Sequence, residues 1–368
     1  MNFWEKLGFK KRSFTDAYAP VMPYNLIADT AGKAVNGNSA MSVPPYAAAV
    51  TLMSTSLAKL SLHIEKDGKR VADNTVYELL ERPSQLYDRF TLFQQAEINA
   101  LNEGNGYILI ERNADKTPKQ LLLVNPAFVS IIFQGGKYEY QVTPANGEMM
   151  KVKPEDMIHV KTPYLDYDAV KGVPYHKVLE KQLGLWLASQ DYQNKYFSMG
   201  SNPLAVIEVP EKLSQEKREM VRESWEQMSA GDNKHRVAIV DAGMRHKNLG
   251  FNFAELEMKH IYENVSKQIA SVFNIMPAML GQDGSNNTYT NTEMQNMQFL
   301  QMALMPRIIA FEAQLSKLFP QGSGLKAKFN YESLLRADSK ARAERLKLLV
   351  ESEIMCKEEA RALEGLEN

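Results

Sequence analysis

The stretch IASVFNIMPAMLGQDGSNNTYTNTEMQNMQ, Ile269 to Gln298, joins the end of one helical pattern to the start of the next. Its middle is a run of Gly, Ser, Asn, Thr and Gln. From Gln268 to Pro306 the chain has no Lys, Arg or His, and its only acids are Asp283 and Glu293. In a chain that is 24% charged, this composition predicts a long, nearly uncharged loop between two helices.

Long helical patterns lie on both sides of the loop. Lys177–Met199 and Phe253–Asn274 precede it, each with apolar residues on one stripe at helical spacing. A third helix is predicted from about Thr292 to Leu318, and Pro306 inside it should kink or restart the helix, because proline lacks the backbone N–H. Such stripes are typical of core packing, but packing against identical neighbours would also explain them.

A compact insert separates the first two of these helices. It is predicted to hold a strand at Leu204–Val209, a helix that begins at the cap residue Ser214, and a second strand at Arg236–Val240. The insert is therefore a small unit of mixed helix and strand.

The first half of the chain mixes helices with short strands. A helix is predicted after Pro44, and LSLHIEKDGKRV then alternates around an Asp-Gly turn, which indicates a hairpin. Further strands follow, separated by NP, GG, PANG and KPED turns. The strand LKAKFNY and two helices, Ser339–Glu351 and Lys357–Leu366, close the chain. The fold class predicted is α+β.

Composition excludes several classes of protein. The 368 residues carry a formal net charge of -1, so no bulk basic field exists to hold nucleic acid or an anionic membrane. No stretch approaches the roughly 18 apolar residues that a membrane span needs. Cys356 is the only cysteine, so an internal disulfide is impossible and a reducing context is expected. Cys356 also has no base nearby in the sequence, which argues against a catalytic role.

Enzyme motifs are mostly missing. No phosphate-binding loop, HExxH, paired CxxC or GxSxG is present. Glu155, His159, Asp166 and Asp168 could form a metal-dependent nuclease site. The simpler interpretation is a solvated turn and a hydrogen-bonded, half-buried imidazole on a strand. We predict no enzyme activity, no metal and no cofactor.

An ordered set of short segments resembles the portal proteins of tailed bacteriophages, the HK97-type portal family. The resemblance runs from about Pro44 to the C-terminus and rests mainly on three segments. These are Ile269–Gly281, Tyr289–Glu293, and Pro306 followed by Glu312 and Leu315. The other segments, in order, are LNEGNGYILIERN, LLLVNPAFVSI, KPEDMIHVK, GVPYHKVLE, NKYFSMGSNPLAVIEVP and LLRADSKARAERL.

The resemblance implies a portal-type division of the chain: an α+β wing, a two-helix stem, a small α/β clip insert, a tunnel loop with a kinked long helix, and a short helical crown. The corresponding ranges are an N-terminal arm at 1–40, the wing at 41–172 with 320–335, stem helices at 173–200 and 253–275, the clip at 201–252, the tunnel loop and long helix at 276–319, and the crown at 336–368.

The resemblance also implies a function. Portals form a homo-oligomeric ring of about twelve subunits at one capsid vertex, through which double-stranded DNA is packaged and ejected. Implied partners are the terminase large subunit, the major capsid protein and scaffold, and a head–tail adaptor. Implied locations are the virion and, during assembly, the host cytoplasm. A ring-forming adaptor without a DNA-translocation role remains an alternative, which a bore too narrow for a duplex would favour.

The uncharged loop corresponds to the tunnel loop that the resemblance implies. DNA must slide past it, and each Lys or Arg on a phosphate would add affinity through counterion release. Amides and hydroxyls can instead make weak, exchangeable contacts, and Gly281 and Gly284 would let the backbone adjust. The predicted channel residues are Gln282, Asp283, Gly284, Ser285, Asn286, Asn287, Thr288, Tyr289, Thr290 and Asn291.

Overall fold

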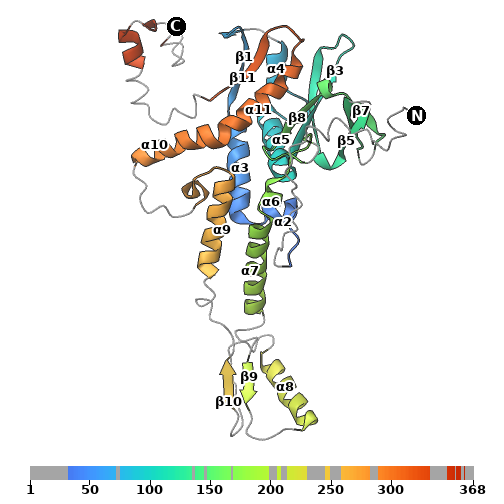
Figure 1. Cartoon of the computed structure of the whole chain (residues 1–368), viewed down its shortest axis with the longest axis vertical. Coiled ribbons are helices and arrows are strands. Elements are labelled where there is room, and N and C mark those ends of the chain that lie inside the picture. Colours follow the sequence, from blue (N-terminus) through green and yellow to red (C-terminus); the bar gives the residue numbers. More distant parts are fainter. Residues whose placement is uncertain are drawn as a thin grey trace, which may run out of the picture.

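The computed structural model describes residues 32–71, 75–134, 137–144, 147–166, 169–198, 205–208, 214–229, 245–248, 258–281, 289–331, 346–352, 354–357 and 360. A body of sheets and helices occupies one end of the molecule (Figure 1). Two long helices, α7 and α9, run down from this body, and the elements β9, β10 and α8 lie at the far end.

Four helices of the body come from the first hundred or so residues. The side chain of Asn36 caps α2 in a capping box, Pro44 opens α3, and the Asp88 carboxylate accepts the Thr91 N–H at the start of α5. The left-handed Gly104, with φ 82°, ends α5. The bounds are α2 Gly37–Met41, α3 Pro44–Ala58, α4 Thr75–Glu81 and α5 Arg89–Glu103.

The predicted hairpin is confirmed, and a third strand from late in the chain joins it. Strand β1 (Ser61–Lys66) turns into β2 (Lys69–Arg70) through Asp67 and Gly68, whose φ values are both positive. On its other side, β1 pairs antiparallel with β11 (Leu325–Asn330). The order β11-β1-β2 therefore joins residues 325–330 to the first half of the chain.

Two more three-stranded antiparallel sheets complete the body. One has the order β4-β3-β8 and the other β5-β6-β7, so the predicted succession of short strands is confirmed. The first sheet packs against α5 through its strands β3 and β8, and β3 also follows directly after that helix in the chain. The bounds are β3 Asn105–Arg112, β4 Pro118–Val124, β5 Val129–Gln134, β6 Lys137–Val142, β7 Met150–Val152 and β8 Met157–Lys161.

The two long helices that descend from the body pack against each other. A short helix α6 (Tyr175–Val178) leads into α7 (Glu180–Ser198), and α9 covers Met258–Val272. The rings of Trp186 on α7 and Tyr262 on α9 lie 4.4 Å apart between centroids. Both helices agree with the predicted ones where the chain is described, and residues 253–257 lie outside the described part.

The insert at the far end contains a helix and a two-stranded antiparallel sheet. Helix α8 (Gln215–Ser229) follows Ser214, whose hydroxyl accepts the Lys217 N–H as a cap. Strand β9 (Ala205–Glu208) confirms a predicted strand, whereas its partner β10 (Arg245–Asn248) is one that the sequence does not predict. The strand predicted at Arg236–Val240 lies outside the described residues.

The third long helix is broken as predicted, but in a way that the sequence does not indicate. It consists of α10 (Tyr289–Gln298), a π-helical turn η5 (Phe299–Leu304), α11 (Met305–Leu315) and a 3-10 turn (Ser316–Leu318). Pro306 stands in the first turn of α11, where its missing N–H costs little. The π turn interrupts the regular α-helix before this proline, and the α-helix resumes at Met305.

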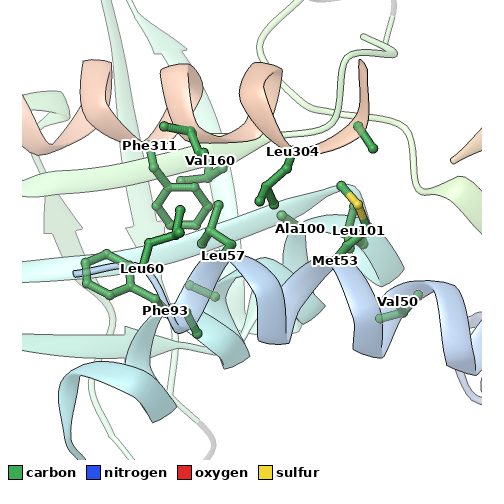
Figure 2. Packing of buried hydrophobic residues seen from close by; sticks show 14 of the residues in the cluster. Val50, Met53, Leu57, Leu60, Phe93, Ala100, Leu101, Val160, Leu304 and Phe311 are labelled. Atoms are coloured by element: carbon green, nitrogen blue, oxygen red, sulfur yellow. The ribbon is translucent and has the colours of Figure 1, made fainter. Parts of the chain in front are cut away.

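One large core holds the body together. Figure 2 shows α11 and its preceding turn, through Phe311 and Leu304, lying over α3 and α5. The Phe93 ring of α5 meets both Phe311 and Phe329 edge-on, with centroids 5.8 and 5.7 Å apart. The core therefore joins α3 and α5 from the start of the chain to α11 and β11 from its end.

The ends of the chain are described only in part. The predicted arm is described only from residue 32, and the predicted crown only at 346–352, 354–357 and 360, where residues 346–351 are helical. Cys356 is exposed. Among the described helices none is long and apolar enough to cross a membrane.

Candidate functional site

The uncharged loop is the candidate site, and the structure describes both of its supports. Residues 282–288 lie outside the described part. Tyr289, Thr290 and Asn291 form the first turn of α10, so the loop ends three residues earlier than predicted. The N–H groups of a first helical turn lack intrahelical partners, so Thr and Asn, which are unfavourable inside helices, are tolerated there.

The support before the loop is a tight, aromatic-packed turn. Phe273 stacks on Tyr175 at 4.4 Å between ring centroids and meets Tyr46 edge-on at 5.6 Å. The Ile275 N–H then bonds back to the Ala270 carbonyl, and a 3-10 turn, Pro277–Leu280, leads to the loop. This packing fixes where the loop leaves the body.

Gly281 is the last described residue before the loop. Its φ of 77° lies in the left-handed region, which residues with a Cβ rarely adopt. No atom would lie within 4 Å of a Cβ added there. The glycine is therefore required by the backbone turn itself and not by a close neighbour.

The support after the loop is anchored by a buried ion pair. Arg307, in the first turn of α11, pairs with Glu97 of α5 through two hydrogen bonds of 2.7 Å, Nε to Oε1 and Nη2 to Oε2. The two side chains are 5% and 0% exposed. Nη1 also donates to the Lys161 carbonyl on β8. One side chain thus fixes α11 to both α5 and β8.

The charge on Arg307 is secured by its partner. Burial by itself would lower the pKa of Arg307, but the adjacent Glu97 carboxylate holds that pKa above its ordinary value. Buried charges are tolerated when they are paired and fully hydrogen-bonded. The pair therefore holds the start of α11, directly after the π turn, against α5 and β8.

Sequence reasoning missed this pair, although a signal was present. Arg307 sits next to Pro306 among the apolar residues of α11, and Glu97 sits between Phe93 and Leu101 among those of α5. Two opposite charges on apolar stripes indicate a buried pair, since a lone buried charge is too costly.

Among the described residues of the alternative nuclease site, His159 is engaged in hydrogen bonds of its own. His159 is 4% exposed, and both ring nitrogens are engaged, Nδ1 with the Tyr140 hydroxyl at 3.0 Å and Nε2 with Asn105 Oδ1 at 2.9 Å. Burial lowers the pKa of His159 to about 3, so the ring is neutral. The prediction of a satisfied structural histidine is confirmed.

The acids of that alternative site lend it no support. Glu155 is exposed and faces Lys153, with Oε1 3.8 Å from the lysine Nζ. Asp166 lies in a turn whose N–H bonds the Lys171 carbonyl, and Asp168 lies outside the described residues. Within the described ranges, no group of three His, Cys, Asp or Glu side chains could hold a metal ion.

Comparison with known proteins gives one family over most of the chain. The family model described as phage portal protein matches residues 44–365. The probable portal protein of Streptomyces phage phiC31 is 26% identical, over 100% of this chain and 86% of the relative. The portal protein of Enterobacteria phage HK97 is also 26% identical, over 94% of this chain and 83% of the relative.

Solved structures share the fold. An HK97-family phage portal protein from Corynebacterium diphtheriae superposes with a TM-score of 0.61 at 14% identity, covering 82% of this chain and 96% of that one. A chain from the neck of a native gene transfer agent particle, computed with C12 symmetry, superposes with a TM-score of 0.59 at 19% identity. The match covers 90% of this chain and 92% of that one.

Proposed function

The chain belongs to the phage portal protein family, and from that premise we propose that it is the subunit of a head–tail connector ring at one capsid vertex. The family match over residues 44–365 carries the proposal. The twelve-fold symmetry of a neck structure with this fold supports a closed ring of about twelve copies.

The parts of the chain take their proposed roles from the family. The mixed body is the wing, α7 and α9 are the stem, and the unit of β9, α8 and β10 is the clip. The tunnel loop spans Gln282 to Thr288, with α10 as its outgoing support. The residues from 336 onward form the crown. The elongated arrangement in Figure 1, with two antiparallel helices leading to a small terminal unit, supports this assignment.

The tunnel loop contacts passing DNA but binds its phosphates only weakly. The described residues on both sides, from Gln268 to Gly281 and from Tyr289 to Pro306, contain no Lys, Arg or His. Without cations nearby, phosphates gain no counterion-release affinity at this point of the channel. Amide and hydroxyl groups offer weak hydrogen bonds that water can exchange.

The role is structural and not enzymatic. The sequence has no phosphate-binding loop to couple nucleotide hydrolysis to movement. The energy for packaging therefore comes from a separate motor, the terminase large subunit, which docks on the ring. The major capsid protein and scaffold surround the ring during assembly in the host cytoplasm, and a head–tail adaptor binds afterwards in the virion.

Negative-stain electron microscopy of the purified full-length chain tests the proposal. End-on views are expected to show a ring whose bore admits a duplex of about 20 Å. A ring with a narrower bore would instead support an adaptor that does not translocate DNA. A chain that stays monomeric under every assembly condition would overturn the ring itself.

A further inference from the structure

The helix that leads away from the tunnel loop presents methionines to solvent. Met294 is 70% exposed and Met297 49% exposed, and the two lie three positions apart on one face of α10. Met302, in the following π turn, is 59% exposed. We name these three residues the methionine stripe. Grouped apolar exposure of this kind marks a surface that a partner covers.

Helix α10 also lacks the features that support a free-standing helix. Its ten residues run directly into the π turn, where Phe299 and Leu300 are buried, so packing in the core is shown at its C-terminal end. Figure 1 shows it extending away from α3, α5 and the sheets. The only charge between Tyr289 and Met305 is Glu293, so ion pairs do not stabilise its surface. A neighbour that covers its exposed methionines would therefore stabilise this segment.

We propose that the methionine stripe docks on the α10 and π-turn region of the adjacent copy of this chain. The inference rests on the proposed ring and names one of its interfaces. A second copy is the favoured occupant because the surface needs an apolar, uncharged partner, and the same segment of the next subunit is equally poor in charge. A duplex is a polyanion and gains nothing from a methionine face without cations.

Ring geometry places the copies at the right separation. Packed helices lie about 8–10 Å apart between axes. About twelve helices spaced by about 9 Å at their loop ends would lie on a circle of radius about 17 Å. The circle of helix axes is about 35 Å across, and helices about 10–12 Å thick leave an opening of about 23 Å, which admits a duplex of about 20 Å. Helices that flank the narrowest point of such a channel therefore lie at packing distance from their neighbours.

The first test compares two charge substitutions in the full-length chain. Met294→Glu/Met297→Glu places carboxylates in the proposed interface, whereas Met220→Glu changes a methionine of α8 that is 69% exposed. Mass photometry over a concentration series should show that the stripe variant needs at least about tenfold more protein to form rings, since apolar burial would be replaced by charge repulsion. The Met220→Glu control should assemble like the wild type, and circular dichroism should show that all three chains are equally folded.

A photo-cross-linking amino acid at position 297 gives a second, independent readout. Irradiation of assembled rings is expected to join it to residues of a second copy between 289 and 310. Cross-links to the C-terminal segment of its own chain, or to DNA, would overturn the inference. So would a stripe variant that assembles as well as the wild type, and this result would leave the proposed function intact. A wild-type chain that forms no ring would overturn both.

Discussion

At the scale of single residues, the Arg307–Glu97 pair joins segments 210 positions apart and fixes the segment that leaves the loop. Arg307→Met should lower the free energy of unfolding by about 3–5 kcal/mol, because the Glu97 carboxylate would remain buried without its partner. Urea denaturation of the unassembled chain measures this loss. Glu97→Leu/Arg307→Met removes both charges and should lose less than either single variant. A loss below about 1 kcal/mol for Arg307→Met would contradict the role of the pair.

Residue roles are predictable from the sequence only where local pattern determines them. The sequence predicts His159 as a satisfied strand histidine because it alternates with apolar neighbours, and its bonds to Tyr140 and Asn105 confirm this. The partnership of Arg307 with Glu97 depends on how α5 and α11 cross, which periodicity within either helix does not contain. The Asn105 side-chain oxygen likewise accepts a hydrogen bond of 2.8 Å from the backbone N–H of the distant Gly172. This bond forms only because the chain folds back there.

At the scale of elements, the π turn sets which side chains of the broken helix face the core. Leu304 is fully buried, whereas Met302, two positions earlier in the same turn, is 59% exposed. Leu304→Ala should therefore cost about 2–5 kcal/mol of unfolding free energy, through lost burial and the cavity left behind. Met302→Ala should change it by no more than about 0.5 kcal/mol in the unassembled chain. Equal losses in urea denaturation would show that the turn has a different register.

The helices themselves are predictable from the sequence, but their exact form is not. Pro306 indicates a kink, and the break occurs beside it. The sequence around the π turn carries no local signal for it, and Phe299 and Leu304 at its two ends are both buried in the core. In the insert, β10 at Arg245–Asn248 escapes prediction because RHKN carries no apolar alternation, and its pairing with β9 determines the strand.

At the scale of the whole molecule, long-range pairing follows from family resemblance and not from pattern. Nothing in LKAKFNY indicates that Leu325–Asn330 pairs with Ser61–Lys66 across the whole chain. Once that pairing is formed, Phe329 reaches Phe93 and Phe311, and segments far apart in the sequence share one core. The same core holds residues of α9, of the π turn and of α11, so the described segments on both sides of residues 282–288 pack together.

The proposed role of the uncharged loop makes a prediction for the proposed ring. Asn286→Lys/Asn287→Lys should slow DNA passage, because each lysine that rests on a phosphate adds affinity. Duplex binding by the purified ring should then fall more steeply with salt, by about 0.9 in the slope of log K against log salt for each phosphate that a lysine neutralises. Asn286→Gln/Asn287→Gln keeps the amides and should match the wild type in both binding and packaging rate. If the lysine variant also matches the wild type in both measurements, the loop does not touch DNA.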